Sequence, residues 1–256
     1  MNHLRNLSLC LLLAVHTLTG CSKSKADEKQ TQGYAPVSIS IRQGGNTTPT
    51  ATINFDYNRS NQLTTISQKQ DGGTMTMEFE YGLDGMVSKA TVTNFVGATP
   101  MVYNYQYKNG KLSAIAYETA SLTENLTLTY DAATRSYAMQ SEGSSDKLIY
   151  QLNETGDLTG FGSNKSDVFK LTYGAGKGVF ADFPLQIGHF IPMQLGLVYL
   201  YFGSSHEIKK LMVSGLEVSI VATTDSKGYI TQSVITDGNN NNKTTSDYTY
   251  VLKDLN

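Results

Sequence analysis

The sequence predicts a predominantly all-β protein, built as a curled antiparallel up-and-down meander or an open barrel. Three observations lead to this prediction. Residues typical of strands and turns abound, among them 16 tyrosines and 23 glycines, whereas only 16% of the residues are charged. Polar and apolar residues alternate over short runs, as they do in strands with one buried face. Finally, one spacing of aromatic, turn and aliphatic residues recurs along the chain.

The first twenty residues have the features of a signal peptide that is removed from the mature protein. Arg5 precedes an apolar run from Leu7 to Val15, which is shorter than the roughly 20 residues that span a bilayer. Residues 18–21, Leu-Thr-Gly-Cys, resemble the lipobox of bacterial lipoproteins. The resemblance implies that Cys21 becomes the acylated first residue and anchors the protein in the outer membrane of the cell envelope. The alternative is an ordinary secretory signal with an unmodified Cys21.

A short polar segment follows the anchor. Residues 21–33 combine the lipidated cysteine with a flexible tether, because residues 22–33 are polar or charged and have no apolar periodicity. One β-meander domain is then expected over residues 34–256. Lys25 with the acidic residues after it is loosely similar to export signals of surface lipoproteins, but an ordinary spacer fits equally. The side of the membrane that the protein faces therefore stays open.

Charge and cysteine content exclude several classes of function. Arg5 is the only basic residue of the first twenty, so the mature chain has 19 basic and 22 acidic residues. This balance provides no basic surface for nucleic acid. Cys10 leaves with the signal peptide and Cys21 carries the lipid. The mature domain therefore has no thiol for a disulfide, a zinc site or nucleophilic catalysis.

A degenerate repeat organises the first two thirds of the chain. Tyr57 is followed six residues later by Leu63 and nine residues later by Ile66. The same spacing recurs in Tyr81, Val87 and Ala90 and in Leu152, Leu158 and Phe161, and a copy one residue shorter consists of Tyr107, Leu112 and Ile115. Weaker copies begin at Tyr130, Tyr173 and Asp225. Each unit has the length of about two strands and two turns.

The residues between the aromatic and aliphatic positions predict tight hairpin turns. Asn61, Gly85 and Gly156 stand at the fourth position after the first residue of their copies, and these residue types tolerate a left-handed backbone. The shorter copy has Asn109-Gly110 instead, a typical two-residue hairpin turn.

The tyrosines are interpreted first as cross-strand packing residues of the sheet. Leu112 and Ile115 are three residues apart, so they point to opposite faces unless a bulge intervenes. We therefore expect that neither face is purely polar and that the sheet curls, is covered or binds a ligand.

This pattern resembles the YD repeats of RHS-type proteins, in which a tyrosine, a short polar turn and Leu-x-x-Ile recur. It is also similar to a family of uncharacterised Gram-negative lipoproteins built from a curled meander. The resemblance covers residues 50–175 well. It implies a fold of YD-like hairpins and carries over no functional residue.

Residues 179–202 break the alternation with a nearly continuous apolar run. Two prolines and several glycines argue against a membrane-spanning helix, and a short helix is expected from Met193 to Tyr201 within a helical or irregular stretch near 185–202. Three interpretations stay open: a plug or cover of the sheet, the lining of a pocket for a lipid or other apolar ligand, or a partner-binding patch. The candidate residues are Phe183, Ile187, Phe190, Ile191, Leu195, Leu197, Tyr199 and Tyr201.

Few residues of the mature chain could support catalysis. Its two histidines are His189, which lies in the apolar run, and His206, which follows two serines and precedes Glu207. A serine, histidine and acid trio can be drawn around His206, but no nucleophile-elbow motif frames either serine. His189 has no second histidine or carboxylate at metal-ligand spacing. We predict no catalytic residue, no metal and no cofactor.

These observations together predict a non-catalytic envelope lipoprotein that acts as a binding or scaffolding module on the outer membrane. The alternatives are a carrier or sensor of an apolar ligand and a hydrolase of unknown substrate. The membrane is the expected partner, through the lipid on Cys21, and a glycan, a lipid or another envelope protein are the candidate binding partners. The sequence does not predict an oligomeric state.

Overall fold

The computed structural model describes residues 32–93, 99–193, 199, 201–237 and 242–255. The signal peptide, Cys21, most of the tether, Leu195 and Leu197 lie outside these residues. The described part contains sixteen strands and the helix α1 (Ile187–Met193). The strands are β1 (Gln32–Gln43), β2 (Ala51–Tyr57), β3 (Leu63–Gln70), β4 (Gly73–Tyr81), β5 (Val87–Thr93), β6 (Met101–Lys108), β7 (Lys111–Glu118), β8 (Thr123–Asp131), β9 (Ser136–Ser141), β10 (Leu148–Leu152), β11 (Leu158–Ser163), β12 (Asp167–Lys177), β13 (His206–Val213), β14 (Leu216–Thr224), β15 (Ile230–Asp237) and β16 (Lys243–Asp254).

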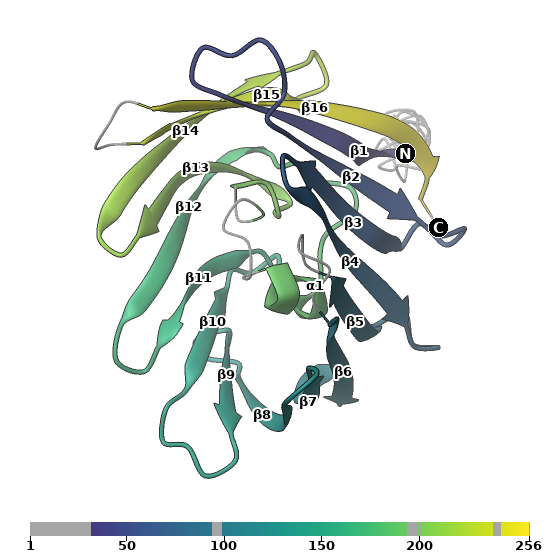
Figure 1. The fold of residues 1–256 in the computed structure, drawn as a ribbon, viewed down its shortest axis with the longest axis vertical. Helices are drawn as coiled ribbons and strands as arrows, with labels where there is room; N and C mark the ends of the chain where they lie inside the picture. Colours follow the sequence, from purple (N-terminus) through teal and green to yellow (C-terminus); the bar gives the residue numbers. More distant parts are fainter. Residues whose placement is uncertain (1–31, 94–98, 194–198, 200, 238–241, 256) are drawn as a thin grey trace, which may run out of the picture. The chain divides into compact units, whose positions relative to one another are not determined.

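The strands form a closed antiparallel barrel. Each strand pairs with the next, and β1 pairs with β16 from Gln32 opposite Asp254 to Gln43 opposite Thr244 (Figure 1). The predicted all-β, up-and-down architecture is confirmed, whereas the expectation of an open sheet is wrong. Closure satisfies the backbone groups that an open meander leaves unpaired at its two edges. We call the end where β1 begins and β16 ends the proximal end, and the opposite end the distal end.

One loop geometry recurs at the proximal end. The backbone N–H of Asn58, Gly82, Asn153 and Asp225 donates to the carbonyl four residues later, which closes a tight loop each time. The fourth residue of each loop has a left-handed backbone, with φ of 60° at Asn61, 75° at Gly85, 90° at Gly156 and 84° at Gly228. The left-handed turns expected from the sequence are therefore confirmed. The copy at Asp225, weak in sequence, has the same geometry as the strong ones.

A β-bulge after each turn explains the Leu-x-x-Ile spacing. Tyr107 pairs with Leu112, but Gln106 pairs with Ala114, so that Ser113 is left out of the register. The extra residue turns Leu112 and Ile115 to the same, inner face, and both are 1% exposed. The same shift follows the turns that begin at Asn58, Gly82, Asn153 and Asp225. The alternative with a bulge therefore applies to Leu112 and Ile115, which share the inner face.

The repeated tyrosines join one hairpin to the next. Tyr81 donates its hydroxyl to the carbonyl of Leu63 over 2.6 Å, and Tyr107 donates to that of Val87 over 2.9 Å. Tyr173 makes the equivalent bond to Leu158 over 2.5 Å. In each case the acceptor is the first residue after the preceding turn. Burial raises the pKa of all three hydroxyls, so they remain protonated donors.

Polar and charged side chains cover the outer face of the wall. Along β4, Met75, Met77 and Phe79 are buried, while the intervening residues point outward and Glu78 and Glu80 are exposed. Ion pairs join neighbouring strands across this outer face: Glu80 and Lys89 lie 2.8 Å apart, Lys210 and Glu217 2.9 Å, and Arg42 and Asp247 2.6 Å.

The barrel interior is a hydrophobic core that includes α1 (Figure 1). The helix ends at Met193, where the sequence-based prediction had it begin. Its last turn contains Pro192, which has no N–H to donate to the carbonyl of Gly188. The hydroxyl of Tyr105, on β6, donates to that carbonyl over 3.0 Å and so takes the place of the missing helix bond. A barrel tyrosine thus allows a proline-containing helix inside the core.

Candidate ligand-binding site

The connection between β12 and β13, residues 178–205, enters the barrel; we call its described residues the inner segment. Ile187, Phe190, Ile191 and Tyr199 are buried within the hydrophobic core. Phe183 is half-buried, and its ring packs against that of Tyr57 at a centroid distance of 6.0 Å. Tyr201 is half-buried and lines a cavity described below. Leu195, Leu197 and Cys21 lie outside the described residues.

Polar contacts tie the start of the inner segment to the barrel. Asp182 Oδ2 accepts the backbone N–H of Tyr34 at 2.8 Å and the hydroxyl of Tyr229 at 2.5 Å. The side-chain amide of Gln186 bridges the hairpin between β4 and β5: Nε2 donates to the carbonyl of Gly85 and Oε1 accepts the N–H of Val87, each over 3.0 Å. The segment is therefore held on both sides of the proximal opening.

His189 takes part in a directed chain of hydrogen bonds inside the barrel. Its Nδ1 accepts the backbone N–H of Gln186 at 2.9 Å, so that Nε2 carries the proton and donates to the hydroxyl of Tyr81 over 2.9 Å. Tyr81 in turn donates to Leu63. Burial lowers the pKa of His189 to about 3, because the charged ring would be desolvated. The imidazole is therefore a neutral packing and capping group.

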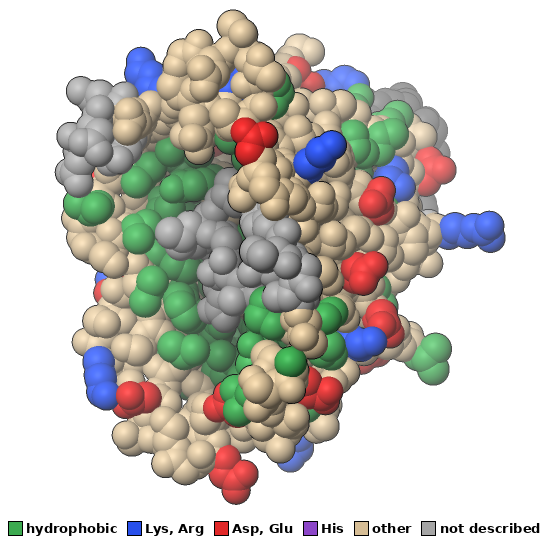
Figure 2. Space-filling view, in the orientation of Figure 1, with side chains coloured by type: hydrophobic (Ala, Val, Ile, Leu, Met, Phe, Trp, Pro, Cys, Tyr) green, Lys and Arg blue, Asp and Glu red, His purple; other side chains and the backbone are tan. Residues whose placement is uncertain are grey.

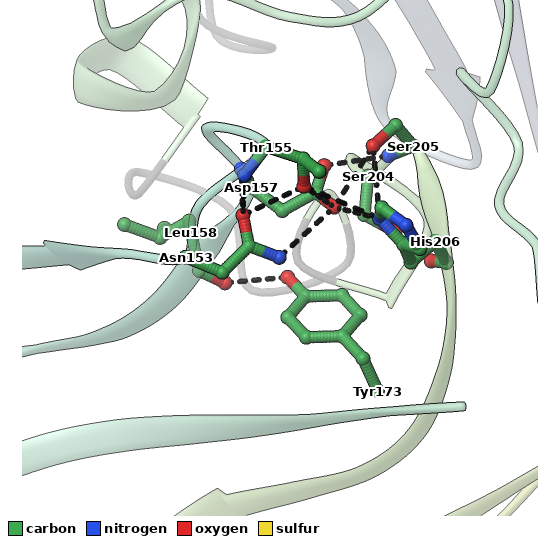
Figure 3. A network of polar contacts seen from close by, with 8 residues as sticks. All are labelled: Asn153, Thr155, Asp157, Leu158, Tyr173, Ser204, Ser205 and His206. Carbon is green, nitrogen blue, oxygen red and sulfur yellow. Dashed lines mark hydrogen bonds and ion pairs between the residues drawn. The ribbon is translucent and has the colours of Figure 1, made fainter. Parts of the chain in front are cut away.

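A polar network ties the end of the inner segment to the turn before β11 (Figure 3). Asp157 is 3% exposed, and its two oxygens accept the N–H of Ser205 at 2.7 Å, the Ser205 hydroxyl at 2.9 Å and Nδ1 of His206 at 2.6 Å. Asn153 Nδ2 adds a fourth, longer bond of 3.3 Å. The carboxylate is thus surrounded by donors from two segments far apart in the sequence.

The arrangement around His206 differs from a catalytic triad. In a triad the acid binds one ring nitrogen and the nucleophile lies on the other. Here Asp157 and the Ser205 hydroxyl, 3.1 Å from the ring, both lie at Nδ1, and the Ser205 hydroxyl has Asp157 as its acceptor. The acid is Asp157 rather than Glu207, whose carboxylate contacts Lys209 at 2.5 Å. This geometry fastens the segment and does not activate the serine.

An apolar cavity of about 610 Å³ opens at the distal end. Its wall consists of Tyr201, Val213, Leu216, Val218 and Ile235. Its rim is polar and consists of Gln43, Gly44, Asn242, Lys243 and Thr244. Figure 2 shows hydrophobic side chains gathered in a hollow on the side of the molecule where β12, β13 and β14 curve. We call this cavity the mouth.

The apolar wall of the mouth includes one exposed residue. Leu216 is 49% exposed and Ile235 is 7% exposed, so the lining runs from the surface into the core. Lys243 is exposed, and no carboxylate whose side chain is described lies within ion-pair distance of it; the side chain of Asp237 is outside that set. An apolar wall with one cation on its rim suits an amphiphile with a negative or polar head.

A smaller cavity of about 250 Å³ lies at the proximal end, beside Tyr57, Tyr81 and His189. Among the described residues, no group of three or more His, Cys, Asp or Glu side chains could hold a metal ion. No helix in the same part of the chain is long and apolar enough to cross a membrane.

Sequence reasoning brought out the apolar segment and both histidines but missed Asp157, Gln186 and the mouth. Asp157 and Gln186 act through partners 48 and 99 residues away, so no local pattern marks them. The mouth is formed by inward-facing residues of separate strands. One residue of the mouth had a detectable signal in the sequence. Leu216 is an apolar residue directly after the turn residues Ser214-Gly215, and it is the exposed first residue of β14.

Comparison with known proteins gives a limited result. No protein-family model matches the chain, and no curated protein matches it. Among solved structures, a porin-like protein from Bacteroides uniformis aligns over 84% of this chain and 96% of its own, with 16% identity and a TM-score of 0.39. A porin-like protein from Bacteroides vulgatus aligns over 85% and 99%, with 10% identity and a TM-score of 0.47.

Proposed function

We propose that this chain is a non-catalytic lipoprotein of the cell envelope that binds the apolar part of a ligand in the mouth. Acylation of Cys21 would hold it at the outer membrane. The YD-like repeat would provide a rigid barrel that presents the binding cavity. Partner proteins and glycans are further candidates for the same binding role.

The observation that carries this proposal is the distribution of side chains over the barrel. Barrels that cross membranes have an apolar outer band, and a charged residue facing lipid at mid-depth costs roughly 2–4 kcal/mol. Here the outer face carries cross-strand ion pairs such as Lys210 with Glu217, and most large apolar side chains are buried in the core. The exposed exceptions on the strands include Val168, Met212, Val221 and Val251. The wall therefore suits water, and the mouth is where an apolar lining reaches the surface.

The absence of catalysis in this proposal is supported by geometry. Among the described residues, the serine hydroxyl that lies beside the His206 ring is that of Ser205, and it donates to Asp157. The Ser204 hydroxyl donates to the backbone carbonyl of His206 and not to its ring. His189 is buried and neutral, with both ring nitrogens bonded.

Displacement of a fluorescent fatty-acid probe from the purified mature protein tests the function. We expect saturable binding that Leu216→Asp weakens at least tenfold, because a carboxylate in the apolar wall must be desolvated when the tail enters. Leu122→Asp is the matched control, since Leu122 is 50% exposed and does not line the mouth. Equal affinity in both variants, or no saturable binding, contradicts the proposal.

A further inference from the structure

Four lysines of the proximal end lie over tyrosine rings. Lys177 lies over the ring of Tyr229 at 3.8 Å and Lys227 over that of Tyr34 at 4.7 Å. Lys253 lies over Tyr57 at 5.1 Å and Lys111 over Tyr130 at 4.4 Å. All four pairs lie at the proximal end, because each lysine stands at the strand end or turn that the antiparallel order places there. We call Lys111, Lys177, Lys227 and Lys253 the proximal lysines.

The positive charge of the proximal lysines is available to a partner. None of them lies within 4 Å of a carboxylate oxygen among the described residues, whereas Lys89, Lys165 and Lys210 on the wall or the distal end are ion-paired. A tyrosine ring holds an ammonium group in place without neutralising it. The rings of Tyr34 and Tyr229 are themselves 4.7 Å apart, which joins two of the lysines into one site.

Three acidic residues of the same end, Asp182, Asp225 and Asp254, are engaged by donors other than lysine side chains. Asp182 accepts from Tyr34 and Tyr229, as described above. Asp225 accepts the backbone N–H groups of Lys227 and Tyr229 within its own turn. Asp254 accepts the side-chain amide of Gln32 at 2.9 Å. These carboxylates therefore have partners that are not lysines.

Apolar side chains protrude from the same end. Leu83, at the tip of the turn between β4 and β5, is fully exposed, and Leu252 is 47% exposed. The strand that contains Leu252 pairs it with Tyr34. Tyrosine, lysine and leucine side chains in one surface are the combination that settles at a lipid headgroup layer.

We propose that the proximal end docks on a membrane surface that carries anionic phosphate headgroups. The first strand, β1, begins at this end, at Gln32. From Cys21 to Gln32 an extended chain reaches at most about 40 Å, so an acylated Cys21 keeps this end near the bilayer. Basic residues held near an anionic leaflet add to such an anchor. The mouth then opens at the far end, away from the membrane. This inference rests on the proposed lipid anchor.

The test uses the mature lipoprotein in vesicles of phosphatidylethanolamine and phosphatidylglycerol. An environment-sensitive probe is attached to Ser226→Cys at the proximal end or to Asn46→Cys at the distal end. We expect quenchers attached to the lipids to reach the proximal probe at least fivefold more efficiently than the distal one. Lys177→Gln, Lys227→Gln and Lys253→Gln together should remove most of this difference.

The matched control replaces Lys69, Lys147 and Lys165, which lie at the distal half of the barrel, by glutamine and should leave the difference unchanged. Equal quenching of the two probes, equal effects of the two triple variants, or undiminished quenching in phosphatidylcholine vesicles overturns the docking proposal. The docking proposal is also overturned, in favour of a glycan partner, if soluble peptidoglycan fragments displace the protein from the vesicles and the lipid composition has no effect. If mass spectrometry finds no acyl chains on Cys21, the proposed anchor alone is overturned. Docking is then tested by sedimenting the unacylated chain with anionic vesicles: co-sedimentation supports docking, and its absence overturns it.

Discussion

One tyrosine hydroxyl in each hairpin forms a hydrogen bond with the hairpin before it. Tyr81, Tyr107 and Tyr173 each use the ring to fill the inner face and the hydroxyl to bind a carbonyl of the strand before. Those carbonyls lie beside a bulge, where the regular ladder is interrupted. A phenylalanine would fill the same volume but leave the carbonyl without this donor.

Tyr107→Phe is therefore expected to lower the free energy of unfolding by about 1 kcal/mol. Urea unfolding followed by circular dichroism measures this change. Tyr117→Phe is the control, because no described residue forms a hydrogen bond with the Tyr117 hydroxyl and both tyrosines are partly exposed. A loss as large in Tyr117→Phe would mean that the hydroxyl of Tyr107 has no special role.

His189 is expected to make the protein acid-sensitive. Its pKa is about 3 in the folded protein and near 6.5 when unfolded, so between these values the unfolded chain binds one more proton. Stability is then complete above pH 6.5 and falls as the pH drops, by up to about 1.4 kcal/mol per unit.

Unfolding free energies measured from pH 7 to pH 4 check this expectation. His189→Gln removes the titrating group, so its stability should depend less steeply on pH than that of the natural sequence. Parallel curves for the two proteins would show that His189 does not contribute to the acid sensitivity.

At the scale of elements, the inner segment depends on fastenings at its two ends. Asp157 binds Ser205 and His206 at the end of the segment, and Asp182 binds Tyr34 and Tyr229 at its start. Between them, α1 packs in the core with its proline compensated by Tyr105. The segment is part of the core and not a loop on the surface.

Asp157→Ala should destabilise the protein by about 2 kcal/mol or more, since it leaves the buried N–H of Ser205 and its neighbours without an acceptor. Hydrogen exchange should accelerate in residues 202–208 more than in β1. Asp131→Ala is the control, because Asp131 binds residues of its own exposed turn. Unchanged exchange in residues 202–208 would contradict the fastening role of Asp157.

Local signals in the sequence were sufficient for the all-β class and for several of the hairpin turns. Asn61, Gly85 and Gly156 marked left-handed turn positions, because few other residues adopt that conformation. The direction of Leu112 and Ile115 could not be deduced, since a bulge depends on the partner strand. The helix was expected to begin at Met193, whereas α1 ends there and contains Pro192. The donor that compensates for Pro192, Tyr105, is 87 residues away, so no local signal reveals it.

At the scale of the whole molecule, barrel closure and the candidate site both depend on residues that are far apart in the sequence. No residue of β1 indicates that its second neighbour is β16. The mouth likewise combines β13, β14 and β15 with the rim residues Gln43 and Lys243 of β1 and β16. The apolar character of residues 179–202 was visible in the sequence, but its place inside a polar-walled barrel required the three-dimensional arrangement.

The pairing of β1 with β16 also determines the order in which the molecule can be completed. Gln32 and Asp254 are neighbours in the barrel yet 222 residues apart, so the last ladder joins the most distant parts of the domain. Contacts of such long range form slowly because the intervening chain must first be ordered. Until the final strand has formed, the first strand therefore keeps one unpaired edge, and that edge can pair with another chain during folding.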